Sequence, residues 1–351
     1  MIKPYLAVCM QPPIRTARTR KEVGENIKRA ADQIGLSVFL RRRWPSAWVS
    51  GDVRIVAFPE YCFTDWRRIA KGDIDAMDVS IEIPGPEVEP LARAAKENKI
   101  YVAAQALEIV PQFPGHYMNA MFIFGPDGSL VYRRHKLRHL LLTLYSSPND
   151  ILDKYMAAFS KGRSVGETVF PVVKTEIGTL GMCVCHEVAT PEVARQLAAN
   201  GAEVIIRPTN EPETYWHHLD RARAIENMVF WIMSNSGYST EETTVSDYGH
   251  SRIIGFRGEM LGESHSGDTT AGGMINIEEL RAMKLRPGLP LYAHSVFDYH
   301  KIPSIPPNMF DKGMPDRATL EKEYYRLGLL VPEPERRAPA AEGRGVPVTA
   351  K

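Results

Sequence analysis

Short apolar runs alternate with amphipathic segments along most of the chain, and this alternation constrains the fold more than any other feature. The runs with the length and apolar content of buried strands are 5–10, 53–58, 100–107, 120–124, 181–185, 204–206 and 231–234. Apolar spacing and helix start or stop residues predict helices over 20–34, 86–98, 191–200 and near 215–230. Because strand, helix and strand follow one another between 181 and 206 at the spacing of a parallel crossover unit, the sequence predicts an α/β protein.

Most of the chain is expected to form one large folded domain, residues 1–300. Its 351 residues, 44% of them hydrophobic, are enough to bury a large core, and no internal linker divides this part. Residues 40–51, which contain Arg41–Arg43, predict an exposed insertion. Residues 301–330 predict an extension that crosses to a partner subunit as an arm. Residues 331–351 have too little apolar content to fold and predict a disordered tail.

Charge balance and cysteine content limit the classes of partner. The 43 basic and 42 acidic residues leave a formal net charge of +1, so we expect neither nucleic-acid binding nor attraction to a membrane surface. No apolar run approaches the ~18 residues of a membrane span. Four cysteines in a chain of this length do not suggest a disulfide framework. These features predict a soluble cytoplasmic protein with reduced thiols.

Cys185 lies where the run 181–185 ends, shortly before the helix that starts at Pro191. Side chains at the carboxyl ends of strands occupy the usual place for a site in an α/β sheet, and a strand-to-helix turn exposes N–H groups that can bind an oxyanion. A thiol there is a candidate nucleophile. The alternative is a small buried core residue, which is what most cysteines are.

Two further candidates also follow strands. Glu60 comes after the run 53–58 and could act as a general base, although an ordinary loop glutamate is the alternative. Lys136 ends the segment Tyr132-Arg133-Arg134-His135-Lys136, where a fixed positive charge could hold a developing oxyanion. The alternative for that segment is a solvated basic run.

Taken together, these motifs resemble those of the nitrilase superfamily of carbon–nitrogen hydrolases. The order Glu60, Lys136, Cys185 is that of the family, and the resemblance covers about residues 4 to 280. The stretches that carry it are Val56-Ala-Phe-Pro-Glu60, His116–Gly128 before the lysine, Gly181-x-x-x-Cys185 with Pro191-Glu192, Arg221–Asn227 with Ser234-Asn235, and Ser251–Gly258.

The resemblance implies a four-layer αββα sandwich, pairing of subunits into a homodimer or higher homo-oligomer, and no metal or organic cofactor. It implies that Cys185 attacks the substrate carbon, that Glu60 takes the thiol proton and later activates water, and that Lys136 stabilises the tetrahedral intermediate. Ammonia or an amine leaves first, and the thioester is then hydrolysed. The family also supplies a second glutamate soon after the lysine. Here none occurs between Lys136 and Glu167, and Asp150 and Asp153 are the acids available instead.

The substrate class and two rival interpretations remain open at this point. Cys185-His186-Glu187 resembles the nitrilase motif at the glutamate but not at the aromatic position, so we favour an amidase or carbamoyl-amide hydrolase over a nitrilase. A catalytically inactive relative that serves as a binding subunit is the alternative of another class. Cys183 and Cys185 in one strand would point to the same face and could be metal ligands, but zinc sites prefer Cys-x-x-Cys spacing. We therefore expect Cys183 and Cys62 to be packing residues.

Overall fold

The computed structural model describes residues 1–43, 51–137, 146–211, 216–237, 248–265, 269–284 and 322. The expected interface arm, apart from Lys322, the expected tail, and residues 44–50 of the expected insertion lie outside these residues, as does the segment directly after Leu137. Within the described part, no helix is long and apolar enough to span a membrane.

Two six-stranded sheets form the centre of the molecule. The first has the order β12-β1-β2-β3-β4-β5 and the second β11-β10-β9-β8-β7-β6. The strands of the first are β1 (Tyr5–Met10), β2 (Val53–Ala57), β3 (Tyr101–Ile109), β4 (Tyr117–Phe124), β5 (Leu130–His135) and β12 (Thr270–Ile275). Those of the second are β6 (Val173–Thr175), β7 (Gly178–Met182), β8 (Val204–Thr209), β9 (Phe230–Asn235), β10 (Arg252–Ile254) and β11 (Met260–Glu263). Strands β1, β2 and β3 run parallel to one another, as do β7, β8 and β9.

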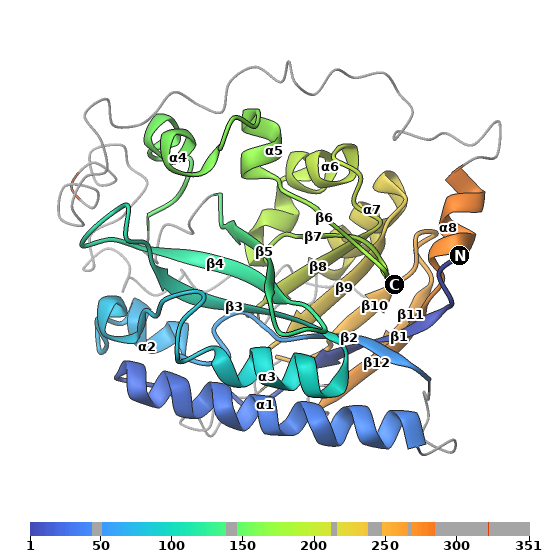
Figure 1. Cartoon of the computed structure of the whole chain (residues 1–351), viewed down its shortest axis with the longest axis horizontal. Helices are drawn as coiled ribbons and strands as arrows, with labels where there is room; N and C mark the ends of the chain where they lie inside the picture. Colours follow the sequence, from blue (N-terminus) through green and yellow to red (C-terminus); the bar gives the residue numbers. More distant parts are fainter. Residues whose placement is uncertain are drawn as a thin grey trace, which may run out of the picture.

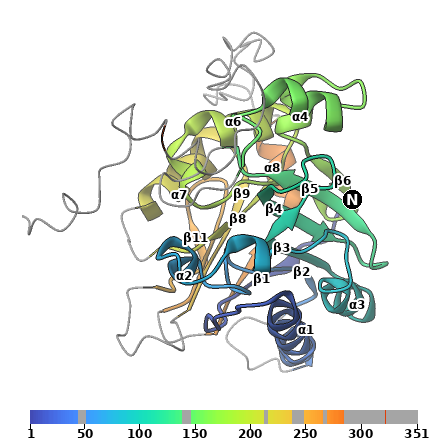
Figure 2. The same ribbon diagram turned by 90° about the vertical axis from the view of Figure 1, so that its left-hand side faces the viewer.

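Helices cover the outer face of each sheet, so that the layers follow the order helix, sheet, sheet, helix (Figures 1 and 2). Helices α1 (Arg20–Arg43) and α3 (Glu89–Asn98) lie under the first sheet, and α6 (Pro191–Ala199) and α7 (Trp216–Asn227) lie over the second. The shorter elements are α2 (Trp66–Ala70), η1 (Ala76–Val79), α4 (Leu152–Phe159), α5 (Val165–Val169), η2 (Cys185–Ala189) and α8 (Ile277–Lys284). The expected αββα sandwich is thus confirmed.

Three apolar cores separate these four layers. Strand β1 shows how the alternation of side chains builds them, because Leu6, Val8 and Met10 pack toward α1 and α3. Tyr5, Ala7 and Cys9 point the other way and pack between the two sheets, together with residues of β7, β8 and β9. The third core lies between the second sheet and its helices. Strands buried on both faces explain why the sequence shows near-continuous apolar runs.

One sequence expectation about the fold is wrong for the residues that can be compared. Arg41–Arg43 belong to the last turn of α1 and not to an exposed insertion. The apolar stripe of α1 continues past Ile34 to Val38, which is buried, so the helix packs on the sheet for longer than predicted. Basic residues in the last turn also interact favourably with the negative end of the helix dipole. Arg41 reaches Thr270 of β12, with Nη2 2.8 Å from the hydroxyl oxygen.

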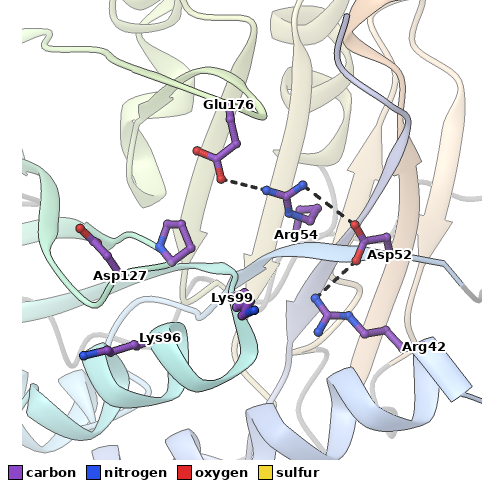
Figure 3. A pocket seen from close by; sticks show the side chains of 8 residues that line it. Arg42, Asp52, Arg54, Lys96, Lys99, Asp127 and Glu176 are labelled. Carbon is purple, nitrogen blue, oxygen red and sulfur yellow. Dashed lines mark hydrogen bonds and ion pairs between the residues drawn. The ribbon is translucent and has the colours of Figure 1, made fainter.

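The two ends of the parallel strands carry different groups. At the amino ends, an open pocket is lined by Arg42, Asp52, Arg54, Lys96, Lys99, Pro126, Asp127 and Glu176. Figure 3 shows Arg54 between the carboxylates of Asp52 and Glu176; its Nη2 lies 2.8 Å from Glu176 Oε1. This pair joins the two sheets, since Arg54 belongs to β2 and Glu176 to the β6–β7 turn. The candidate catalytic residues lie at the other, carboxyl ends.

Candidate active site

Cys185 begins the 3₁₀ helix η2, three residues after β7 ends at Met182. Its φ is +48°, a left-handed conformation that is uncommon for a residue with a side chain. The expectation that Cys183 and Cys185 share a face is therefore wrong, because the chain turns at Cys185 and its side chain no longer follows the alternation of the strand. Cys183 is fully buried in the core beneath the helices, whereas Cys185 is partly buried and packs against the core between the sheets.

Glu60 and Lys136 meet beside Cys185. Lys136 Nζ lies 2.9 Å from Glu60 Oε1, and both side chains are almost completely buried. Lys136 directly follows β5, and its backbone N–H donates to the carbonyl of Asn119 on β4 at 2.8 Å. The three candidates thus come from β2, β5 and β7, elements far apart in sequence that end at the same edge of the sandwich.

Polar groups from both sheets hold Glu60 in place. Asn119 Nδ2 donates to Glu60 Oε1 at 2.8 Å, and Gln105 Nε2 donates to Asn119 Oδ1 at 3.0 Å. From the second sheet, the carbonyl of Thr209 accepts a hydrogen bond from Glu60 N, and Ser236 Oγ donates to the Glu60 carbonyl at 3.1 Å. A buried carboxylate with this many fixed partners is preorganised for proton transfer.

The thiol of Cys185 is protonated in the resting site. Burial, followed by the negative charge of Glu60, raises its pKa to about 12, while Lys136 acts in the opposite direction. The charge of Glu211 contributes to the same rise in the thiol pKa. Because a thiol is a poor nucleophile, this site needs a base at the moment of attack, and Glu60 is near enough for its charge to act on the thiol.

Glu187 connects the cysteine segment to the lysine segment. Its carboxylate accepts from the backbone N–H groups of Val184 at 3.0 Å and Leu137 at 2.7 Å, which are the chain neighbours of Cys185 and Lys136. The same carboxylate makes a two-pronged ion pair with Arg134, at 2.6 and 2.9 Å. Burial opposes the positive charge of Arg134, but the contact with Glu187 outweighs it and holds the arginine pKa above its ordinary value.

A second buried charge cluster lies behind the cysteine. Arg207 Nη1 donates to the carbonyl of Cys185 at 2.9 Å. Glu211 Oε1 lies 2.6 Å and Asp220 Oδ2 lies 2.9 Å from Arg207 Nη2. Burial raises the pKa of Asp220 to about 6, although the adjacent Arg207 lowers it. Glu211 follows β8 and is, in the described part of the chain, the acid besides Glu60 whose charge acts on the Cys185 thiol.

The two aspartates considered as substitutes for a second glutamate have other surroundings. Asp150 is buried and accepts from the backbone and hydroxyl of Ser147, at 3.1 and 2.9 Å. Asp153 lies in the first turn of α4. Neither is among the groups whose charge shifts the Cys185 pKa, whereas Glu211 is.

The structure brings together Glu60, Lys136 and Cys185, which the sequence singled out, and adds groups that it did not. Arg134 and His135 are buried, so the solvated-run interpretation of this basic segment is wrong. Asn119, Glu187, Arg207 and Glu211 were missed as site residues. Asn119 and Glu187 lie inside the family-like motifs of the sequence, and this position could have identified them. Neither a motif nor the spacing of residues along the sequence pointed to Arg207 or Glu211. Among the described residues, no group of three or more His, Cys, Asp or Glu side chains is placed to hold a metal ion.

Comparison with known proteins gives the class. The structure resembles that of Nit3 from Saccharomyces cerevisiae, a member of branch 10 of the nitrilase superfamily, with a TM-score of 0.62 and 21% sequence identity over 84% of this chain and 97% of that one. The sandwich is therefore of the nitrilase type.

The sequence comparisons give the family. The carbon–nitrogen hydrolase family model matches residues 6–284, and the chain belongs to this family. It is 28% identical to the omega-amidase NIT2 of Xenopus tropicalis over 254 residues, which is 71% of this chain and 85% of the relative. It is 25% identical to a formamidase of Bacillus cereus (strain Q1) over 273 residues, covering 76% and 72%. The expectation of an amidase-type carbon–nitrogen hydrolase is confirmed at the level of class.

Proposed function

We propose that this protein hydrolyses a carboxamide through a thioester on Cys185, with Glu60 as general base and Lys136 as the oxyanion-stabilising cation. The observation that carries the proposal is the buried ion pair of Glu60 and Lys136, whose Oε1 and Nζ lie 2.9 Å apart and whose two charges both act on the thiol of Cys185. A base, a fixed cation and a nucleophile near one another are the groups that acyl transfer from an amide requires.

The first half of the reaction forms the thioester. Cys185 Sγ bonds to the carbonyl carbon as its proton passes to Glu60, and Lys136 stabilises the negative charge on the former carbonyl oxygen. When the tetrahedral intermediate collapses, the carbon–nitrogen bond breaks and the protonated Glu60 gives its proton to the departing ammonia or amine.

The second half returns the enzyme to its starting state. Glu60, again a carboxylate, takes a proton from water as the water oxygen bonds to the thioester carbon. The carbon–sulfur bond then breaks, Cys185 recovers its proton from Glu60, and a carboxylic acid leaves. Since one residue serves twice as base and twice as acid, its fixed position between the two sheets is the central requirement.

A primary amide is the favoured substrate. The omega-amidase and formamidase relatives support it, because their names describe amide hydrolysis. A nitrile would use the same thiol and the same cation, and a carbamoyl amide differs only in the group next to the carbonyl. The test below separates these classes from one another and from an inactive binding subunit.

The experiment measures ammonia release from aliphatic amides, aryl amides, carbamoyl amino acids and nitriles. Cys185→Ala should abolish the turnover of the accepted class, while Cys183→Ala, a matched cysteine substitution in the core beneath the helices, should retain it. Turnover that survives in Cys185→Ala would refute the nucleophile. If no class is turned over by the wild type, yet a substrate analogue binds, the protein is an inactive binding subunit. Turnover of nitriles alone would make it a nitrilase.

Two further properties belong to the same proposal. A homodimer or higher homo-oligomer is supported by exposed apolar side chains near the end of α7 and on β11, where Ile225 is 47% and Met260 36% exposed. Light scattering coupled to gel filtration tests it, and a monomer at all concentrations would contradict it. A cytoplasmic location is supported by cysteines that are all unpaired, and localisation of a tagged protein tests it.

A further inference from the structure

Arg207 is a fully buried arginine on the strand next to the nucleophile. It belongs to β8, which pairs with β7, and its Nη1 donates to the backbone carbonyl of Cys185 at 2.9 Å. Nothing in the reaction itself requires a second cation at this place. Taking a charge out of water costs free energy unless the charge is paired and hydrogen-bonded. A fully buried guanidinium at this place therefore calls for a structural or functional explanation.

The carbonyl that Arg207 contacts belongs to a residue in an unfavourable backbone conformation. Cys185 has φ +48°, and conformations of this kind are strained when a side chain is present, so they persist only where the surroundings enforce them. The backbone conformation sets the direction of the Cα–Cβ bond, and hence where Sγ lies relative to Glu60. The carbonyl carbon and Cβ of Cys185 are both bonded to its Cα. A donor that fixes the carbonyl therefore also limits the directions in which the thiol can point.

Arg207 is itself fixed from two sides. Glu211 binds Nη2 at 2.6 Å and Nη1 at 3.2 Å, and Asp220 of α7 lies 2.9 Å from Nη2. Trp231 on β9 donates its indole N–H to Asp220 at 2.7 Å. The guanidinium therefore has little freedom to move away from the Cys185 carbonyl. Its two acidic partners lie just after β8 and on α7, and not in the segment of Cys185.

We propose that Arg207 is a positioning residue that holds Cys185 in its left-handed conformation and so aims the thiol at Glu60. This inference rests on the proposed function, since it assigns a role within the same site. Arg207 does not touch the substrate. Its two acidic partners, Glu211 and Asp220, keep it aligned and balance its charge.

The test replaces Arg207 by lysine. Lysine keeps the positive charge for the two acids, but one ammonium group cannot also reproduce the planar fork that reaches the Cys185 carbonyl. We expect kcat to fall by about 10²-fold, the effect of a displacement of roughly 1 Å in a reacting group. KM should change little, because the substrate-binding surface is left intact. The thiol pKa of Cys185 should fall, because the sulfur moves away from the Glu60 carboxylate that raises it.

Arg223→Lys is the matched control. Arg223 is also buried, donates through Nε to the carbonyl of Val188 in η2 at 3.0 Å and pairs with Glu226, but it does not bind the nucleophile. It should lower the free energy of unfolding while leaving kcat, KM and the Cys185 pKa near their wild-type values. If Arg207→Lys behaves like Arg223→Lys, the arginine is merely structural and the proposal is wrong.

A second variant keeps the proposal testable should Arg207→Lys fail to fold. Asp220→Asn retains the size of the side chain and an oxygen for the indole of Trp231, but removes one ionic anchor of Arg207. It should show the same loss in kcat at constant KM, to a smaller extent; an unchanged kcat in a folded Asp220→Asn protein would contradict the role. Because the thiol pKa is measured without substrate, this readout decides the role of Arg207 even if Cys185→Ala were to retain turnover and the proposed reaction failed.

Discussion

Glu187 and Arg134 form a two-pronged ion pair, at 2.6 and 2.9 Å, in a part of the molecule where neither side chain reaches solvent. Arg134 is on β5 of the first sheet, and Glu187 is in η2, directly after the second. The glutamate also binds the backbone N–H groups next to Cys185 and Lys136. One carboxylate therefore fixes the distance between the segments that carry the nucleophile and the cation.

Replacing Glu187 by glutamine should strongly destabilise the protein. The substitution leaves the buried guanidinium of Arg134 without its counter-charge, and breaking a buried pair in this way costs about 3–5 kcal/mol. Urea unfolding followed by circular dichroism measures this cost. Replacing the exposed Glu89, which pairs with Arg93 on the surface of α3, by glutamine is the control, and it should cost less than ~1 kcal/mol. Similar losses for both variants would contradict the assigned importance of the buried pair.

Replacing Glu60 by glutamine should have opposite effects on thiol acidity and on turnover. Burial and then the negative charge of Glu60 raise the pKa of Cys185 to about 12, so removing that charge lowers the thiol pKa and increases the thiolate fraction at a given pH. Turnover should nevertheless fall by about 10²–10⁴-fold, because the general base is lost.

Thiolate absorbance as a function of pH, with Cys185→Ala subtracted, measures the acidity in this variant. Glu108→Gln provides the control, because Glu108 is equally buried but binds His135 and Arg133 rather than the thiol. It should leave the Cys185 pKa unchanged. An unaltered thiol pKa in Glu60→Gln would show that the two groups are not in contact.

His217 should make the fold less stable at mildly acidic pH. Burial and the nearby Arg252 and Arg207 lower its pKa to about 3 from an ordinary 6.5. As the pH falls from about 6.5 toward 3, the unfolded chain takes up a proton at this position that the folded chain does not. The stability contributed above pH 6.5 is therefore lost progressively, at up to roughly 1.4 kcal/mol per pH unit.

Chemical unfolding at a series of pH values checks this effect. In His217→Gln the unfolding free energy should fall less steeply with acid over this range, by up to roughly 1.4 kcal/mol per pH unit relative to the wild type. Equal slopes for His217→Gln and the wild type would mean that His217 is protonated in the fold.

Cys183 should be dispensable for catalysis although it lies two residues from the nucleophile. It packs beneath the helices with Val193 and Leu197, away from the site. Cys183→Ala should retain near-wild-type kcat and lose about 1 kcal/mol of unfolding free energy, the usual size of a small core change. Steady-state kinetics and urea unfolding provide the two values. Loss of kcat without loss of stability would place this thiol in the reaction.

The sequence predicted the regular elements well because each has a local cause. The bounds of β1 match the apolar run 5–10, and α6 begins at Pro191 as expected. The end of β7 was misplaced by the sequence, since Cys183 and Val184 continue the apolar character of the strand past Met182, and Cys183 N still donates to Ile206 of β8 at 3.1 Å. The apolar content of these residues reflects burial, which periodicity alone does not separate from strand structure.

The candidate site was partly predictable for a different reason. Glu60, Lys136 and Cys185 follow strands in recognisable motifs, but the groups that hold them act across long sequence separations. Arg134 and Glu187, or Arg207 and Asp220, are charged residues that a sequence-based argument assigns to the surface, because charged residues are rarely buried. Their burial follows from pairing in three dimensions, and no local pattern encodes it.

The core between the two sheets contains small residues such as Ala7, Ala57 and Ala103 beside larger ones. Glu60 follows Ala57 by three positions, and Cys185 approaches it from the opposite sheet. The thickness of this core therefore sets the distance between the Glu60 carboxylate and the Cys185 thiol. Small side chains at these positions leave little room for larger ones, because added groups in a packed core force their neighbours to move. We expect a larger side chain at Ala57 to push the acid and the thiol apart and to slow the enzyme without altering any group that reacts.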